Sequence, residues 1–526
     1  KDIKNLKIEY LLSNKESNKS EAIGTDTLDI PGSFEIQKTY LPPKDFKEGD
    51  YILTAKIDYK NKTTILEHRI TVSVPFFYIK ILGIPIWLLI IIISFLLIAL
   101  TVYFIIRRII EKRKKYKMEI DYKTMEKKSP TTFCLGKIAE KTTDLYYDMG
   151  RLTTHAVVAG ATGGGKSIAA QVFVEEALLK NVAVVVFDPT AQWSGMLRKC
   201  EDKKMISFYP KFKLKPTDAR AFPGSVKFIT NARQAINLKK YINPGQIQIF
   251  ACSKLTPQEM DIFVASTIAS IFKSAPDEFP TLRVLLVFDE VHRLLPKFGG
   301  SGKGFLQIER ACREFRKWGY GVMLVSQVLS DFVGEIKANI NTEVQMRTRD
   351  ESDLNRIKTK YGEEFLQSLI KASVGVGMVV NPAYNRGRPF FTQFRPILHN
   401  TRRLSDAELE KYNHYNDIIE DIEYQIEQLE AEKIDTFDIK MELKLVKEKT
   451  MTGNFTVVDI YLEGLLPRMD KQWQSLGKKP KKREIELVDE SLITASISEA
   501  QKARSDWEKT QKVPESKEEQ PKKEDI

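Results

Sequence analysis

The feature that most constrains this chain is a run of 26 uncharged, mostly aliphatic residues at positions 81–106. About 20 apolar residues in a helix are enough to cross the hydrocarbon core of a bilayer. A secretory signal fits poorly, because the run is too long for such a segment and about 80 residues precede it. Pro85 lies near the start of the run, where a helix tolerates proline. The run therefore predicts one membrane-spanning helix.

Basic residues follow the apolar run at once and give it an orientation. Only Glu111 opposes them locally; they are Arg107, Arg108, Lys112, Arg113, Lys114, Lys115 and Lys117. Because positively charged flanks stay on the cytoplasmic side, we expect the chain after the run to be cytoplasmic and residues 1–75 to lie outside. The predicted arrangement is a single-pass protein of the cell membrane, with 76–117 as span and basic juxtamembrane segment.

Residues 1–75 carry equal numbers of positive and negative charges and have the pattern of β-structure. Alternating apolar and polar residues predict strands at 34–40, 51–59 and 64–74, the last two joined by a Lys-Asn-Lys turn. Such strands favour a small β-sandwich-like domain. This part of the sequence contains no catalytic grouping of residues, so both a spacer and a binding module stay open as its role.

A phosphate-binding motif, G-x-x-x-x-G-K-S, stands between a short apolar strand at 156–159 and a helical run at 168–179. In such a loop the glycines let backbone N–H groups surround phosphates, Lys166 reaches the β- and γ-phosphate oxygens, and the Ser167 hydroxyl binds Mg²⁺. The motif in this context predicts a site for ATP with Mg²⁺. The predicted site consists of Gly160, Ala161, Thr162, Gly163, Gly164, Gly165, Lys166 and Ser167.

Further apolar strands downstream end in polar side chains. The strand at 284–288 is followed by Asp289, which we expect in the Mg²⁺ shell, and by Glu290, which we expect to activate the attacking water. The strand at 320–326 is followed by Gln327, which the same reasoning places near the γ-phosphate or the water. A strand at 182–188 also ends in a carboxylate. Repeated alternation of strand and helix predicts an α/β fold with a mainly parallel sheet covered on both faces.

With these motifs in this order, the chain resembles the HerA/FtsK superfamily of DNA-translocating ATPases. The Asp-Glu-x-His-Arg and Ser-Gln strings are more specific than the phosphate loop, which many NTPases share. The stretch at 134–138 is similar to the strand that leads into the HerA core. The matching segments are 155–167, 187–193, 288–296, 311–319, 324–327 and 336–342.

This resemblance implies a RecA-like P-loop NTPase domain over 118–403 and a hexamer that hydrolyses ATP at its subunit interfaces. It also implies an arginine finger from the neighbouring subunit, which stabilises the charge that develops on the transferred phosphoryl group. Arg316 and Arg347 are the candidates, with Arg316 slightly favoured. A membrane helix directly before the motor makes the chain similar to FtsK and to conjugative coupling ATPases, and it suggests a membrane channel as a partner.

The charge of the chain is distributed unevenly. The total is +12, but residues 129–403 alone carry an excess of 14 positive charges, whereas residues 404–526 carry an excess of nine negative charges. A basic motor domain suits DNA bound through its phosphates without strong sequence preference.

The pattern changes after 404. A capping box at Ser405 and Glu408 and an apolar seam with 3,4 spacing predict a helical hairpin or coiled-coil region over 404–476. Its members are Tyr412, Tyr415, Ile419, Ile422, Ile426 and Leu429. The Lys-, Glu- and Ser-rich stretch at 477–526 predicts a disordered charged tail.

Three functions remain open on these grounds. The first is a membrane-anchored, hexameric, DNA-pumping ATPase. The second is a related ATPase that powers secretion or pilus assembly and acts on protein cargo. The third is a membrane receptor with a nucleotide-switch domain, which the hydrolytic set of Asp289, Glu290 and Gln327 makes the weakest of the three.

Overall fold

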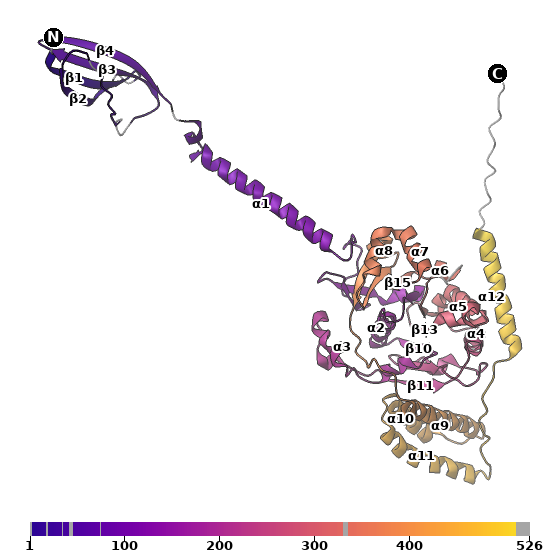
Figure 1. Ribbon diagram of the computed structural model, residues 1–526. Helices are drawn as coiled ribbons and strands as arrows, with labels where there is room; N and C mark the ends of the chain where they lie inside the picture. Colours follow the sequence, from indigo (N-terminus) through magenta and orange to yellow (C-terminus); the bar gives the residue numbers. More distant parts are fainter. Residues whose placement is uncertain are drawn as a thin grey trace, which may run out of the picture. The chain divides into compact units, whose positions relative to one another are not determined.

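The chain folds into two compact units, residues 1–113 and residues 114–526, which we describe separately. The computed structural model (Figure 1) describes residues 3–16, 19–33, 35–41, 46–73, 75–329 and 335–511. The first unit contains a small antiparallel sheet and an apolar helix, and the second contains the nucleotide-binding motif on a large sheet.

The first unit opens with a four-stranded antiparallel sheet in the order β2-β1-β3-β4. Strands β3 and β4 confirm two of the predicted strands, and Lys60 and Asn61 form their turn with positive φ, as a tight hairpin turn requires. The predicted sandwich is not confirmed, because a sandwich needs a second sheet facing the first. The strands are β1 (Ile3–Asn14), β2 (Ser20–Ile30), β3 (Gly49–Tyr59) and β4 (Lys62–Val72).

The predicted strand at 34–40 is wrong as far as the structure describes it, because residues 35–41 are irregular. Their side chains pack across the sheet instead of pairing with it. The Tyr40 hydroxyl donates to Asp26 at 2.9 Å, and the Tyr40 ring lies 5.0 Å from that of Tyr10. Gly24 leaves the space that this ring fills, since a Cβ there would meet it at 2.3 Å. The alternating pattern therefore reflected packing on a sheet rather than membership in one.

Helix α1 (Ile86–Arg113) contains the apolar run, after a short 3-10 turn and the small hairpin β5–β6 (Lys80–Ile81 and Ile84–Pro85). Among the described residues it is the one helix long and apolar enough to cross a membrane, by the length and composition of Ile86–Ile109. Its large aliphatic side chains, such as Leu96 and Ile98, are exposed along this stretch. The structure thus agrees with the predicted helix, while its placement in a bilayer stays a prediction.

The second unit is built on an eleven-stranded sheet in the order β11-β12-β10-β13-β14-β9-β15-β16-β17-β7-β8. Neighbouring strands are parallel from β11 to β15 and antiparallel from β15 to β8, which confirms a mainly parallel α/β sheet. The strands are β7 (Thr132–Ile138), β8 (Asp144–Asp148), β9 (Ala156–Ala159), β10 (Ala183–Asp188), β11 (Gly224–Phe228), β12 (Ile247–Ala251), β13 (Val284–Phe288), β14 (Tyr320–Ser326), β15 (Thr342–Met346), β16 (Val376–Val380) and β17 (Phe390–Phe394).

Successive residues of a strand point to opposite faces of the sheet. Both sets of side chains are apolar here, and helices cover both faces. In β9, Val158 packs in the core that contains α2, whereas Val157 packs in the core that contains α4 and α5. Both faces are apolar, so the central strands read as continuous hydrophobic runs. The helices of this layer are α2 (Lys166–Leu179), α3 (Lys203–Ser207), α4 (Pro257–Ser274), α5 (Lys303–Glu314), α6 (Glu335–Asn339), α7 (Glu351–Tyr361) and α8 (Glu363–Ile370).

The first three helices after residue 404 form a bundle beside β11 (Figure 1). The Ser405–Glu408 capping box is present, and all six residues of the predicted seam are buried. Asn454 precedes the third helix, but its side chain makes no capping hydrogen bond. The bundle consists of α9 (Asp406–Ala431), α10 (Phe437–Met451) and α11 (Phe455–Ser475).

The predicted disordered tail is wrong over part of its length. Helix α12 (Glu490–Gln511) packs against α4 and α5, where Ile493 and Val488 are buried with Ala265. Arg310 of α5 pairs with Glu499 at 2.8 Å. The tail composition is charged, but a few apolar residues at helical spacing are enough to dock the helix on the core. Residues 512–526 of the predicted tail lie outside the described residues.

Candidate nucleotide site

The phosphate loop leaves the end of β9 at Gly160 and enters α2 at Lys166. Gly160 has φ of 156°, and a Cβ there would lie 2.6 Å from the Cβ of Met346. Gly165 has φ of 94°, and a Cβ there would lie 3.0 Å from the backbone nitrogen of Gly375. Both positions therefore need glycine for conformation and for space. The structure has the predicted strand, loop and helix, with the helix beginning two residues earlier than predicted.

The polar strand ends meet at the edge of the sheet where the phosphate loop lies. Strands β10, β13, β14 and β9 are consecutive and parallel, so their carboxyl ends point the same way. Phe187 pairs with Phe288, which sets Asp188 and Asp289 next to each other, and Ser326 pairs with Ala159, which sets Gln327 next to the phosphate loop. The fold thus brings together the side chains that sequence reasoning selected from three separate strands.

Glu290 is the centre of the site. Its Oε1 accepts a hydrogen bond from Lys166 Nζ at 2.9 Å, and its Oε2 accepts one from Gln327 Nε2 at 3.2 Å. The Nδ1 atom of His292 lies 3.2 Å from the same Oε2. Glu290 also has a left-handed backbone conformation, with φ of 47° and ψ of 41°. Such strain in a non-glycine residue tends to occur at functional sites, and here it turns the carboxylate toward the phosphate loop.

Trp193 fixes the two aspartates and was not assigned a role from the sequence. Its backbone N–H donates to Asp188 at 2.8 Å, and its indole N–H donates to Asp289 at 3.0 Å. Asp188 also accepts hydrogen bonds from the backbone and side chain of Thr190. Trp193 is fully buried, so water has no access to its side of Asp289. The only signal in the sequence was the position of Trp193 in a segment that resembles the HerA pattern.

The charges of the site are not balanced evenly. Burial raises the pKa of Asp289 to about 7, and the neighbouring Asp188 and Glu290 carboxylates add to the rise. Burial also opposes ionisation of Glu290, but the Lys166 ammonium, with help from His292 and Gln327, outweighs it and lowers the pKa of that carboxyl. Glu290 is therefore ionised at neutral pH because Lys166 lies beside it.

The residues of the site fit a magnesium ion that is completed by phosphate oxygens. Among the described residues no group of three or more His, Cys, Asp and Glu side chains is arranged to hold a metal by itself. Mg²⁺ in nucleotide sites takes only one or two protein ligands and otherwise water and phosphate. Burial, with the neighbouring Asp188 and Glu290 carboxylates, raises the pKa of Asp289, and a divalent cation beside it offsets both effects. Ser167 is the second residue of α2, so its hydroxyl group lies next to the phosphate loop.

The structure separates the two arginine-finger candidates. Arg316 lies in the 3-10 turn before β14, and its charge helps to lower the pKa of the buried His155 at the start of β9, at the opposite end of the sheet from Glu290. Arg316 therefore lies away from the edge of the sheet that carries Glu290 in its own chain. Arg347 follows β15, and its carbonyl accepts a hydrogen bond from the Ala161 N–H of the phosphate loop at 3.0 Å. Its side chain is half-buried. The finger role stays a prediction for both residues.

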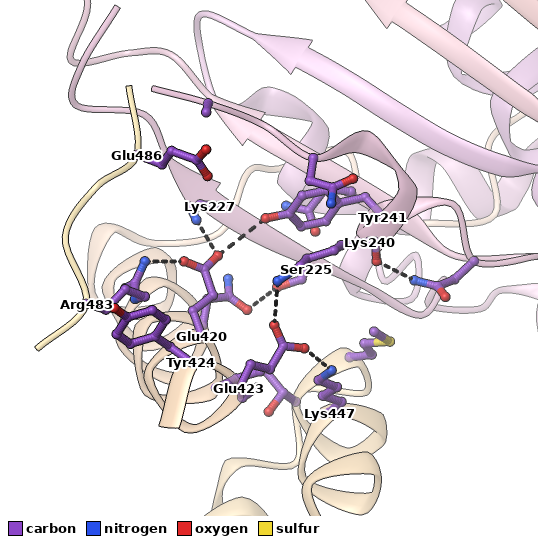
Figure 2. Close-up of a pocket in the computed structure, with 18 of the residues that line it drawn as sticks. Ser225, Lys227, Lys240, Tyr241, Glu420, Glu423, Tyr424, Lys447, Arg483 and Glu486 are labelled. Atoms are coloured by element: carbon purple, nitrogen blue, oxygen red, sulfur yellow. Dashed lines mark hydrogen bonds and ion pairs between the residues drawn. The ribbon is translucent and has the colours of Figure 1, made fainter. Parts of the chain in front are cut away.

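A cavity of about 1260 Å³ lies away from this site, between β11, α9 and residues 481–486. Figure 2 shows that its charged side chains mostly point at one another. Glu420 accepts from Lys227, Tyr241 and Arg483, and Glu423 pairs with Lys240 and Lys447. Because these charges are already matched within the chain, we assign no ligand to the cavity.

The comparisons with known sequences agree with this geometry. The family model described as the central domain of the helicase HerA matches residues 133–262. This segment contains β7, the phosphate loop, α2 and the strand that ends in Asp188. No curated protein matches the chain.

Several solved structures are similar to part of this chain at low sequence identity. VirB4 of Thermoanaerobacter pseudethanolicus is 13% identical with a TM-score of 0.34, and the match covers 51% of this chain and 97% of that one. The genome packaging NTPase B204 of Sulfolobus turreted icosahedral virus 2, in complex with ATP-gammaS, is 12% identical with a TM-score of 0.29, covering 46% and 96%. The pCW3 conjugation coupling protein TcpA is 14% identical with a TM-score of 0.31, covering 58% and 75%.

These TM-scores are below 0.5, so the likenesses to solved structures carry no argument about function. The family match spans the phosphate loop itself and confirms the resemblance that its motifs indicated. Residues 133–262 therefore match the central domain of HerA, and the chain is a P-loop ATP hydrolase that resembles the HerA/FtsK ATPases.

Proposed function

We propose that this ATPase is anchored in the cell membrane by α1 and couples ATP hydrolysis to the movement of DNA, as a homo-hexamer and without strong sequence preference. The observation that carries the DNA part is the excess of 14 positive charges over residues 129–403, within a HerA-type ATPase. Lysine and arginine contacts with phosphates bind any duplex alike. A membrane channel is the partner that such a motor needs to pass DNA through the bilayer.

The membrane part of the proposal rests on α1 and its flanks. The helix is long and apolar enough to span, and the basic cluster at its carboxyl end favours a cytoplasmic ATPase unit with residues 1–75 outside. Arg347 or Arg316 supplies the finger to a neighbouring subunit in the proposed ring. The hydrogen bond from Gln327 to Glu290 supports a hydrolase rather than a passive nucleotide switch.

The residues of the site suggest how hydrolysis proceeds. ATP phosphates bound in the loop compete with Glu290 for the Lys166 ammonium, which has three N–H donors and one carboxylate partner at 2.9 Å. As Lys166 turns to the phosphates, the charge that lowered the pKa of Glu290 moves away, and the carboxylate becomes a stronger base. Glu290 then orients and deprotonates the attacking water, with Gln327 holding the carboxylate or the water in line.

Asp289 and Ser167 are the residues that we propose hold Mg²⁺ together with the nucleotide. The ion, when bound, neutralises charge that develops on the phosphoryl oxygens. Trp193 keeps the Asp289 carboxylate in place from its buried side through the 3.0 Å indole hydrogen bond.

The proposal is tested with the full chain, purified in detergent, by measuring ATP hydrolysis with and without duplex DNA from about 50 to about 200 mM salt. We expect stimulation several-fold at low salt, a steep decline as salt rises, and equal stimulation by two duplexes of unrelated sequence. Lys166→Ala removes the activity and shows that the measured hydrolysis belongs to this chain.

Absence of stimulation at the lowest salt would contradict DNA as the cargo and favour the protein-cargo alternative. A strong difference between the two duplexes would contradict recognition through the phosphates. Either result leaves the assignment as an ATPase intact, because that assignment rests on the phosphate loop and the HerA match.

A further inference from the structure

The first residues of the second unit, which directly follow the apolar helix, are held by contacts within that unit. Helix α1 ends at Arg113, and Tyr116 is already buried, with its ring 5.0 Å from that of Phe391. The backbone N–H groups of Lys115 and Tyr116 donate to Glu140 at 3.1 and 3.4 Å. In the sequence, the basic residues of this segment indicated only the orientation of the helix in a membrane. The structure shows that Tyr116 of the same segment is also buried.

The partner of this segment is the loop between α8 and β16, residues 371–375. The Ser373 backbone N–H donates to the Tyr116 hydroxyl at 3.0 Å, and Lys115 Nζ donates to the Ser373 hydroxyl at 2.9 Å. Two bonds from consecutive residues therefore hold both the backbone and the side chain of Ser373. The adjoining end of α8 is held as well, because the Lys117 backbone donates to Ser368 at 3.3 Å.

The same loop lies against the phosphate loop. The backbone nitrogen of Gly375 and its Cα lie 3.0 and 3.3 Å from the position of a Cβ on Gly165, the residue before Lys166. Gly375 has φ of 80°, and its carbonyl accepts a hydrogen bond from Phe394 at 2.9 Å. Two glycines thus face each other with no room for a Cβ on Gly165, and Cε of Met346 lies 3.3 Å from the same position. A displacement of Gly375 therefore reaches Gly165 directly.

We propose that Tyr116 is a positioning residue for the phosphate loop: by holding Ser373, it fixes the loop at 371–375, whose Gly375 supports Gly165. The segment that leaves the membrane helix thereby sets the affinity of the site for nucleotide. The regulatory consequence rests on the proposed anchoring of α1 in a membrane, because a pull on that helix acts first on Lys115 and Tyr116. The positioning role itself requires only the ATPase activity.

The contacts predict which kinetic constant changes. The phosphate loop binds the phosphates in the ground state and in the transition state alike, and neither Tyr116 nor Ser373 belongs to the Glu290 cluster. Loosening the loop therefore weakens nucleotide binding and leaves the chemical step unchanged, so that KM rises at constant kcat. One neutral hydrogen bond corresponds to a change of about two- to tenfold in binding.

The test compares Tyr116→Phe with the wild type in the full chain, without DNA. Phenylalanine keeps the ring packed on Phe391 and removes only the hydroxyl, so the fold is expected to survive. We expect KM for ATP and the Kd for a non-hydrolysable analogue to rise about two- to tenfold, with kcat unchanged. Lys115→Met, which removes the second bond to Ser373, raises KM in the same direction, and the two effects together deviate from additivity because both act on one residue.

Tyr122→Phe is the matched control. Tyr122 is half exposed, lies in the same stretch of chain, and its hydroxyl accepts a hydrogen bond from Lys141 at 2.7 Å. We expect this variant to have the KM and Kd of the wild type. A Tyr116→Phe variant with wild-type KM and Kd overturns the inference, and so does one whose kcat falls at unchanged KM. Because no DNA is present, failure of the DNA proposal leaves this result interpretable.

Discussion

Helix α2 carries a charged pair near each end, and the two pairs differ in how completely they are satisfied. At the far end, Glu175 is fully buried; it pairs with Arg395 at 2.6 Å and accepts from the backbone of Leu398 at 2.6 Å and of His399 at 3.1 Å. At the near end, Lys166 has a single carboxylate partner, Glu290, on a strained residue. A saturated pair fixes the helix, whereas a pair with unused donors can exchange partners with a ligand.

The electrostatics of the two ends differ in the same sense. Burial opposes ionisation of Glu175, but Arg395 and His399 outweigh it and lower the pKa of its carboxyl. Burial raises the pKa of Asp289 to about 7, and its acidic neighbours add to the rise. The Glu175 carboxylate therefore has its opposite charges within the chain, whereas the buried Asp289 lies beside two further carboxylates. That contrast separates a residue that holds the fold from residues that await a substrate.

The largest expected effect comes from breaking the saturated pair. Glu175→Gln removes one of the two carboxylates that pair with the buried Arg395 and leaves it only Glu176 at 2.8 Å. We expect the free energy of unfolding to fall by about 3 kcal/mol, the lower end of the cost of breaking a buried ion pair. Denaturation of the full chain in guanidinium or urea, followed by circular dichroism, measures the change.

Glu410→Gln is the control for this loss. Glu410 pairs with Lys254 at 3.5 Å, and both side chains are at least half exposed. Its loss is expected to change the free energy of unfolding by less than about 1 kcal/mol. Equal effects of the two substitutions would show that the buried cluster is not a special anchor of α2.

Much of the site was predictable because its signals are local. The phosphate loop, Asp289, Glu290 and Gln327 each follow an apolar strand, and parallel strands bring such ends together. The buried ion pair between Glu175 of α2 and Arg395 was not predictable. The two residues are 220 positions apart, and each alone resembles an ordinary charged surface residue. Trp193 was missed for a related reason, because its indole meets a carboxylate 96 residues away.

The fold, like the site, has features that the sequence predicted and features that it did not. The parallel core followed from repeated apolar strands, and the helix at 406–431 followed from its capping box and seam. Helix α12 was missed because its composition is that of a disordered tail, and only a few residues such as Ile493 and Ala500 make it dock. Regular patterns with many members were therefore predicted correctly, and contacts made by a few residues far apart in the chain were not.

A smaller effect, in pH dependence, sharpens the contrast between the two ends. The pKa of Asp289 is about 7 in the folded chain against an ordinary value of 3.8, so between these pH values the folded chain binds the extra proton. Its contribution to stability therefore falls as pH rises from about 4 to about 7, by about 1.4 kcal/mol for each pKa unit. Asp289→Asn removes this fall, and the variant gains stability over the wild type as pH rises.

The contribution of Glu175 to stability changes with pH in the opposite direction. The pKa of Glu175 in the folded chain lies below its ordinary value of 4.5, so its contribution to stability is present above that pH and is lost as pH falls below it. Unfolding free energies of the wild type, Asp289→Asn and Glu175→Gln, measured without nucleotide from about pH 2 to about pH 8, show the Asp289 trend above about pH 4 and the Glu175 trend below it. Parallel pH profiles for the two variants would contradict the difference between the two ends.

The measurement that tests the central claim most directly is ATP binding and turnover in Glu290→Gln. The account places Glu290 in the chemical step and leaves phosphate binding to Lys166 and the loop. It therefore predicts that the variant binds ATP at least as tightly as the wild type and that kcat falls about 100-fold or more. Turnover at the wild-type rate, or loss of ATP binding together with turnover, would contradict it.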